Sequence, residues 1–247
     1  MRYTNTYDGT LVGVFTFTMA THNNTSDPRH RALYTPVDVA RLARVNPDTL
    51  RRWTQPAGAR LHGLILPAAD DSRSPFSFMN LVEAYVLGFL RREHGLRTPD
   101  IRRAVTWLSR HYPEHRHPLA TLALETDGFD LFVRENDLLI SASESGQIVF
   151  RRIMDQYMSR IERGEDGLPR CLYPYMASVE GPRQIAIDPS VQFGRPVVAR
   201  TRISTSILAE RFAAGESVRA LAADYEVAEE AVEEALRCET HLHGKAA

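Results

Sequence analysis

Two helix-start signals near the beginning of the chain constrain the fold more than any other feature. Thr35-Pro36 and Asn46-Pro47 each combine a side chain that caps a helix N-terminus with a proline suited to the first helical position. Apolar residues at helical spacing follow the first signal, and Val45 interrupts them. The spacing leaves room for a first helix of only about two turns. Two short helices joined by a tight turn predict a helix-turn-helix.

The second of these helices has an apolar face and a polar face. Leu50 and Trp53 lie three residues apart and are expected to pack against the first helix. The remaining positions would then present polar and cationic groups, as a recognition helix does to a DNA groove. A helical hairpin with a solvated arginine pair is the alternative. The residues expected on the polar face are Asp48, Thr49, Arg51, Arg52 and Gln55.

The net charge of the whole chain argues against binding of nucleic acid, but the charges of its segments differ. The 247 residues include 30 basic and 31 acidic side chains, for a net charge of −1. Residues 31–117, however, hold 14 basic and 8 acidic groups, whereas 118–180 hold 6 and 11, and 181–247 hold 8 and 10. The net charge of these segments is therefore +6, −5 and −2. Only the first has the positive charge that phosphate binding requires.

The segment after the second helix predicts a wing and two further helices. Residues 59–78 are hairpin-like, and helices are expected at about 80–94 and 98–111. With the sequence runs YTPVDVARLA at 34–43 and TLRRW at 49–53, this order resembles the DNA-binding module of MerR-type regulators. The wing departs from that pattern because Asp70 and Asp71 would repel phosphate. The resemblance implies a DNA-binding set of Thr49, Arg51, Arg52, Arg60 and Arg73.

Residues 118–180 predict a small antiparallel sheet covered by a helix. Short apolar runs at Leu119–Leu124, Phe129–Val133 and Leu138–Ile140 are separated by turn residues and indicate strands. A helical pattern that includes Ile161 follows. An N-terminal arm, residues 1–30, has a strand-like run at Leu11–Met19 that could join the sheet as an edge.

Residues 181–247 predict two short strands followed by three helices. The strands lie at about 185–187 and 197–198, and the helices begin near Ser204 or Thr205, at Ser217 and near Ala228. The last two helices form a second helix-turn-helix, with its acidic residues on the final helix. Because these would repel a duplex, we expect dimerisation or protein binding there instead of DNA reading. The acidic residues are Glu229, Glu230, Glu233 and Glu234.

The same segment resembles one class of VapB-type antitoxins over about residues 184–238. The resemblance rests on FGRPVV at 193–198, TRI at 201–203, AGESV at 214–218 and LAADY at 221–225. It implies a PIN-domain (VapC-type) ribonuclease toxin as partner. The active site of such a toxin contains clustered carboxylates, and an arginine of the antitoxin could enter that site and pair with them. Arg195, Arg200 and Arg202 are the candidates. Arg202 could instead form an internal salt bridge. Arg200 stands where the family usually has glycine. Because arginine, unlike glycine, does not favour a positive φ, a left-handed backbone is not expected at this position.

Nothing in the sequence predicts an enzyme, a cofactor or a metal site. The group His111, His115 and His117 matches no zinc-ligand spacing and is expected in a solvated connector. Two cysteines make no metal pattern and indicate a reducing compartment, so we expect a cytoplasmic protein. Leu11–Met19 is too short to span a membrane and lacks the features of a signal peptide.

Together these patterns predict an α+β, mostly helical chain divided at 1–30, 31–117, 118–180 and 181–247. The predicted function is an antitoxin that binds a toxin through its C-terminal segment and represses its own operon through 31–117. A homodimer is expected because one reader module covers only half of a twofold operator. The alternative is a stand-alone MerR-like regulator that senses a ligand through its middle domain.

Overall fold

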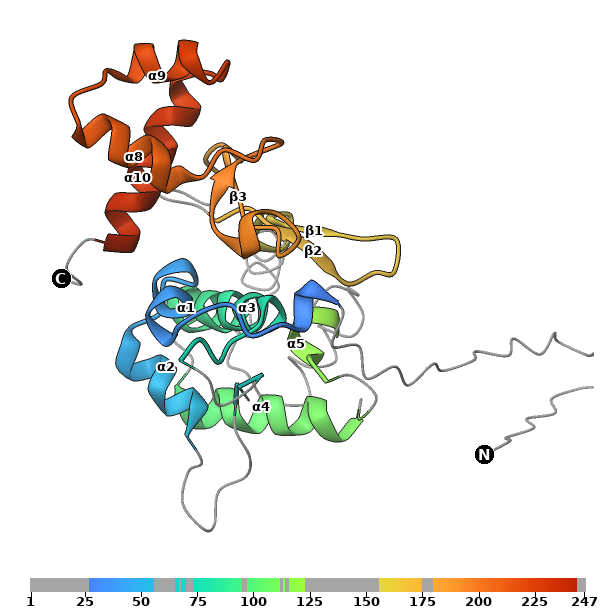
Figure 1. The fold of residues 1–247 in the computed structure, drawn as a ribbon. Helices are drawn as coiled ribbons and strands as arrows, with labels where there is room; N and C mark the ends of the chain where they lie inside the picture. Colours follow the sequence, from blue (N-terminus) through green and yellow to red (C-terminus); the bar gives the residue numbers. More distant parts are fainter. Residues whose placement is uncertain are drawn as a thin grey trace, which may run out of the picture.

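The computed structural model confirms the α+β class (Figure 1). It describes residues 27–55, 65–66, 68–69, 73–94, 97–111, 113, 116–122, 156–174 and 180–243. Within these residues, two antiparallel sheets of two strands each lie between the N-terminal helices and the C-terminal helices (Figure 1). The arm strand and the strands predicted at 129–133 and 138–140 lie outside the described residues.

Helix α3, Phe78–His94, lies at the centre of the N-terminal part. Its residues from Leu81 to Leu90 are almost all apolar and buried, and a helix that is apolar on all sides must be enclosed by its neighbours. The helices that pack on α3 include α1 (Pro36–Leu42), α5 (Pro118–Leu122) and the short 3-10 helix η1 (Pro28–His30). Helix α4 (Thr98–His111) contacts α5.

The predicted helix-turn-helix is present as α1, Pro36–Leu42, and α2, Pro47–Thr54. Thr35 and Asp38 form a capping box at the start of α1, and the Asn46 side chain accepts from Asp48 N at the start of α2. The turn between the helices contains Arg44 at φ 54°. The Arg92 guanidinium, carried by α3, donates to the carbonyls of residues 43 and 44 and so fixes the turn to the central helix.

The middle segment corrects two predictions. Pro118–Leu122 is helix α5 and not part of a strand, because proline starts the helix and the His117 carbonyl accepts from the amides of residues 120 and 121. Ile161 belongs to strand β1, Ile161–Arg163, and not to a helix. Strand β1 pairs with β2, Pro169–Leu172, around a turn that contains Gly167 at φ 74°.

The C-terminal elements begin where the capping residues predict. Strand β3, Ile185–Ala186, pairs with β4, Val197–Val198, and the 3-10 helix η2, Gln192–Gly194, lies between them. Helices α8 (Thr205–Ala213), α9 (Val218–Asp224) and α10 (Glu229–His243) follow. They share a separate apolar cluster that includes Leu208, Leu221 and Val232.

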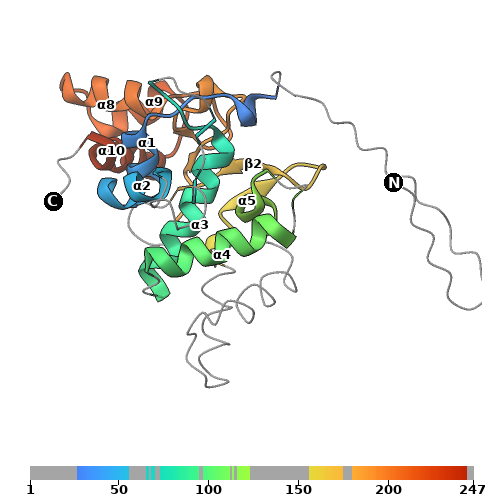
Figure 2. The same cartoon turned by 90° about the horizontal axis from the view of Figure 1, so that it is seen from below.

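Several contacts join this C-terminal part to the rest of the molecule, among them hydrogen bonds from the Arg160 guanidinium to the carbonyls of residues 181 and 182. The Tyr34 hydroxyl donates to Gly194 O at 3.0 Å, His241 Nε2 lies 2.8 Å from Arg41 O, and Leu172 and Ile187 exchange backbone hydrogen bonds. Figure 2 shows α10 beside α1, in agreement with the contacts between these helices. The helix-turn-helix is therefore packed directly against the C-terminal part.

Candidate binding surfaces

The recognition-helix candidate α2 presents two arginines to solvent. Leu50 and Trp53 are buried against the neighbouring helices, as the sequence predicts, while Arg51 and Arg52 are exposed. Arg51 Nη2 lies 3.2 Å from Asp48 Oδ1, an exposed pair that constrains the guanidinium only weakly. The Arg102 guanidinium donates to Arg52 O and holds the end of α2 against α4.

The structure corrects the predicted exposure of Thr49. Its side chain is 5% exposed because residue 49 precedes Trp53 by four positions and therefore shares the buried face of α2. Of the two remaining candidates, Arg73 is exposed and Arg60 lies outside the described residues. The described DNA-facing candidates are thus Arg51, Arg52 and Arg73.

Two of the three predicted toxin-facing arginines line cavities, and these are two different cavities. Arg195, Arg200 and Arg202 are all exposed, and none forms an ion pair within the described part of the chain. Arg202 therefore has no internal salt bridge there. It lines a cavity of about 320 Å³ together with Phe193 and Arg31, whereas Arg200 lines a different one.

Phe193 is a surface residue that is not among the predicted site residues. Its side chain is 78% exposed, and its backbone has φ 55° between Gln192 at φ 47° and Gly194 at φ 74°. A bulky residue rarely adopts this conformation, and such strain is concentrated at functional sites. The hydrogen bond from the buried Tyr34 hydroxyl to Gly194 O holds the turn against the N-terminal part. The sequence signal that could have identified Phe193 is its position directly before the turn glycine Gly194.

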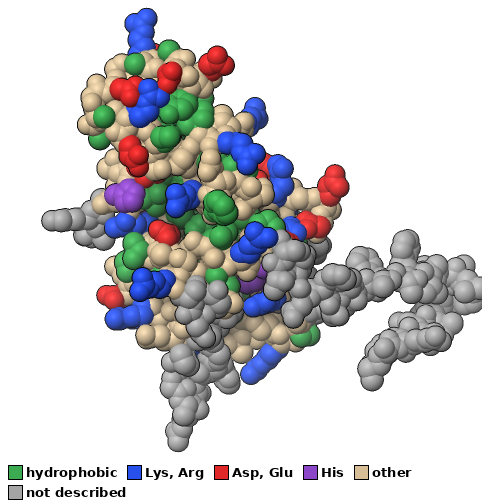
Figure 3. Space-filling view, viewed as in Figure 1, with side chains coloured by type: hydrophobic (Ala, Val, Ile, Leu, Met, Phe, Trp, Pro, Cys, Tyr) green, Lys and Arg blue, Asp and Glu red, His purple; other side chains and the backbone are tan. Residues whose placement is uncertain are grey.

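We call Phe193, Arg195 and Arg202 the turn surface. In the middle of the face shown in Figure 3, hydrophobic side chains lie between Lys and Arg side chains. An exposed aromatic side chain that lines a cavity with Arg31 and Arg202 is suited to a partner that has an apolar pocket within an acidic surface.

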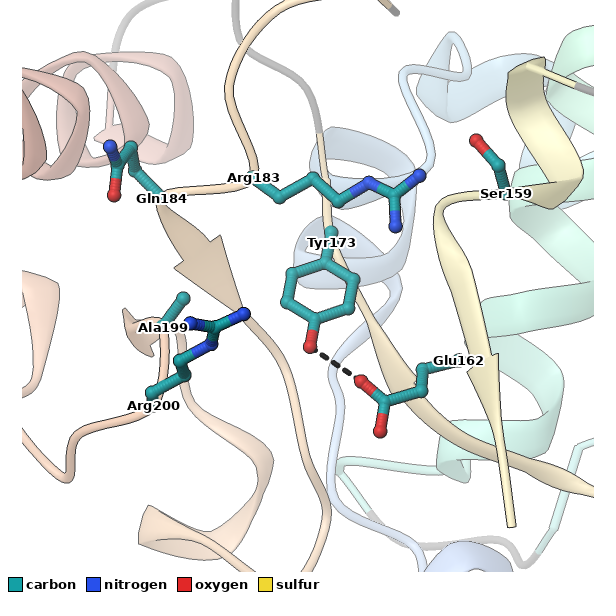
Figure 4. Close-up of a pocket in the computed structure, with 7 residues that line it drawn as sticks. All are labelled: Ser159, Glu162, Tyr173, Arg183, Gln184, Ala199 and Arg200. Carbon is teal, nitrogen blue, oxygen red and sulfur yellow. Dashed lines mark hydrogen bonds between the residues drawn. The ribbon is translucent and has the colours of Figure 1, made fainter.

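The second cavity lies where the two small sheets meet, and we call it the seam cavity (Figure 4). It has a volume of about 530 Å³. Tyr173 donates to Glu162 at 2.6 Å, and Arg170 also pairs with that carboxylate; both contacts lower the pKa of Glu162. The Arg183 Cζ atom lies 5.9 Å from the centre of the Tyr173 ring. The residues lining the cavity are Ser159, Glu162, Tyr173, Arg183, Gln184, Ala199 and Arg200.

The backbone at Arg200 also differs from expectation. Although arginine does not favour a positive φ, Arg200 has φ 63° in the turn after β4, where Thr201 N donates to Val198 O. The turn therefore imposes the left-handed conformation regardless of the residue type.

The histidine group is not the solvated connector that the sequence suggests, at least at His117. This side chain is buried, and its Nδ1 lies 2.9 Å from Glu83 Oε2. His30 packs against it with 5.5 Å between ring centres. Burial raises the pKa of Glu83, and burial together with His117 lowers the pKa of His30. The described residues contain no group suited to hold a metal ion, although His115 is not among them.

The second helix-turn-helix, α9 and α10, keeps its predicted acidic surface with one correction. Glu229, Glu230 and Glu233 are exposed, but Glu234 is buried, and its carboxylate lies 2.9 Å from Arg237 Nη1. The exposed side of α10 still carries an excess of negative charge close to its N-terminus. Among the described residues, no helix is long and apolar enough to cross a membrane.

Comparison with known proteins confirms the predicted resemblance to VapB-type antitoxins. Residues 185–237 match a family described as a protein of unknown function, DUF433. The chain is 28% identical over 226 residues to a Mycobacterium tuberculosis protein described as "Putative antitoxin VapB45", and the match covers 83% of this chain and 92% of that protein. It also matches the crystal structure of Rv2018 from M. tuberculosis with a TM-score of 0.65 and 25% identity, over 84% of this chain and 98% of that one.

Proposed function

We propose that this protein is a non-enzymatic antitoxin that binds and neutralises a PIN-domain ribonuclease toxin. The observation that carries the proposal is the similarity, over 83% of the chain, to a protein described as a putative antitoxin. The turn surface supports it, because Phe193 is 78% exposed and has a left-handed backbone conformation that is unfavourable for a bulky residue, and such strain is concentrated at functional sites.

The turn surface suits an acidic nuclease site in two ways. Phe193 can bury most of its ring in the partner, and aromatic anchors of this kind dominate the binding energy of protein interfaces. Arg195 and Arg202 can pair with carboxylates that would otherwise hold the nuclease's divalent ions. Inhibition then follows from occupying the acidic site and from blocking the approach of RNA.

Coexpression with the product of the neighbouring reading frame tests the proposal. We expect the two proteins to copurify and the full chain to restore growth that the neighbouring product alone prevents. Phe193→Ala should weaken copurification strongly, since truncating such an anchor typically costs about 2 kcal/mol or more. Phe212→Ala is the matched control, because that phenylalanine is also exposed, at 45%, but lies on α8 away from the turn. Failure of both copurification and rescue would overturn the proposal.

The second activity that we propose is autorepression through α2, with a homodimer covering a twofold operator. Its support is the helix-turn-helix geometry, the two exposed arginines and the positive charge of residues 31–117. In a mobility-shift assay, changing Arg51 and Arg52 to Ala should weaken operator binding and reduce the salt slope by about 2. Arg103→Ala removes an exposed arginine of α4 as a control. Unchanged binding by the double variant would exclude α2 as the reader.

A stand-alone regulator that senses a ligand is the second candidate function. The seam cavity favours it, because the cavity borders the middle segment in which such a ligand was expected. Operator binding without copurification or growth rescue would favour this candidate over the antitoxin.

A further inference from the structure

We infer that the seam cavity binds a small oxyanion ligand, meaning a molecule that carries phosphate or carboxylate groups, through Arg183 and Arg200. This inference does not depend on the proposed antitoxin function, since it concerns a cavity that is separate from the turn surface.

The charge of the cavity is the first argument. Its one carboxylate, Glu162, accepts from Tyr173, pairs with Arg170 and also attracts Arg200, so a single negative charge serves three guanidinium groups. Arg183 and Arg200 form no ion pair within the described residues. Other described arginines do pair with carboxylates: Arg29, Arg51, Arg103, Arg170, Arg211 and Arg237. The cavity therefore holds two guanidinium groups in excess of its available carboxylate.

The backbone of Arg200 is the second argument. At φ 63°, a residue with a side chain is less stable than glycine, by about 1 kcal/mol. The arginine at this position thus lowers stability while placing its guanidinium at the cavity. Strain of this kind is expected where the side chain itself serves a function.

The surroundings of the two guanidiniums are the third argument. Arg183 lies over the Tyr173 ring, a cation–π contact that orients it at the cavity wall (Figure 4). Arg200 follows β4 and Arg183 precedes β3, so both guanidiniums come from the same sheet and face the β1–β2 side of the cavity, where Ser159 adds a polar group. The volume of about 530 Å³ is within the usual range for small-molecule sites. Guanidinium groups bind phosphate and carboxylate by the same paired hydrogen bonds, so both classes fit.

Isothermal titration calorimetry of the full chain tests the inference and separates the two sources. The probes are inorganic phosphate, pyrophosphate and citrate, each added at low ionic strength because salt screens such contacts. We expect saturable binding of one molecule per chain for at least one probe. Pyrophosphate bound in preference to citrate would indicate a phosphorylated ligand, and the reverse preference would indicate a carboxylate.

Two variants and one control make the test specific. Arg183→Gln and Arg200→Gly should each weaken binding about tenfold or more, as expected for loss of a charge-assisted contact. Arg219→Gln, which changes an exposed arginine on α9, should leave binding unchanged. Because glycine relieves the left-handed strain, Arg200→Gly should have a Tm at or above that of the unmodified protein. No saturable binding of any probe, or equal binding by all the variants, would overturn the inference without affecting partner binding at the turn surface.

Discussion

At the scale of single residues, one contact explains why position 194 is a glycine. Gly194 has φ 74°, and a Cβ atom at this position would lie 2.2 Å from the Tyr34 hydroxyl. The tyrosine in turn is buried, and burial raises its pKa, so its hydroxyl stays protonated and donates to Gly194 O. The glycine therefore serves two requirements at once, a left-handed backbone and close approach of the helix-turn-helix.

We predict that Gly194→Ala destabilises the protein much more than Gly167→Ala. Both glycines have φ 74°, but a Cβ at Gly167 meets nothing within 4 Å. The control should cost about 1 kcal/mol for the backbone conformation alone. Gly194→Ala should add a steric cost of a further 1–3 kcal/mol, roughly that of overpacking a core. Urea unfolding of the two variants measures the difference, and equal losses would show that the Tyr34 contact contributes nothing.

His30 gives a pH-dependent prediction at the same scale. Its Nδ1 is buried and has no hydrogen-bond partner among the described residues, and its pKa is lowered by burial and by His117. The unfolded chain therefore binds more protons than the folded one just below pH 6.5, so stability should fall as the pH decreases through that range. His30→Gln should show a smaller loss between pH 7 and pH 5 in urea unfolding.

Glu83 does not obscure this comparison. Burial raises its pKa, which gives stability the opposite slope, a decrease as the pH rises above the ordinary carboxyl range. Since Glu83 is present in both proteins, the difference between them isolates the contribution of His30. The same pH slope in both would contradict the assignment.

At the scale of elements, local capping signals predicted the helices well. Thr35, Asn46 and Ser217 cap the helices expected after them, because a cap acts within one turn and needs no tertiary context. The middle segment was harder to predict. Ile161 fits either a helical or a strand pattern, and its strand depends on pairing with Leu172, a contact that periodicity alone does not specify.

We predict that the first cap carries measurable stability. Thr35 Oγ1 accepts from Asp38 N and donates to Asp38 Oδ2 at 2.6 Å, so Thr35→Ala removes both bonds. The expected cost is about 1 kcal/mol in the free energy of unfolding. Thr35→Ser keeps the hydroxyl and should retain most of the stability. If the serine variant loses as much as the alanine variant, packing of the threonine methyl group and not the cap is responsible.

The candidate sites were predictable only in part, for a related reason. Arg51 and Arg52 follow from the face that Leu50 and Trp53 define, a local property. Phe193 and the seam cavity depend on contacts between distant parts of the chain, such as Tyr34 with Gly194 across 160 positions. The spacing of residues along the sequence does not specify which distant residues come into contact.

At the scale of the whole molecule, the two proposed binding surfaces lie on different elements of one connected structure. The largest buried cluster extends from Tyr34 to Ile187 and so includes residues of the helix-turn-helix, the middle strands and the start of the C-terminal part. The proposed DNA contacts are on α2, whereas the proposed toxin contacts are in the turn before β4 and at Arg202 after it. One chain can therefore be altered at either surface without removing the other.

The most direct test of this account is a double comparison of operator binding and partner binding on the same purified proteins. The Arg51→Ala, Arg52→Ala double variant should lose affinity for operator DNA and still bind the product of the neighbouring reading frame. Phe193→Ala should lose that partner and still bind DNA. If either variant loses both activities while remaining folded, or if neither loses its assigned activity, the division of functions proposed here is contradicted.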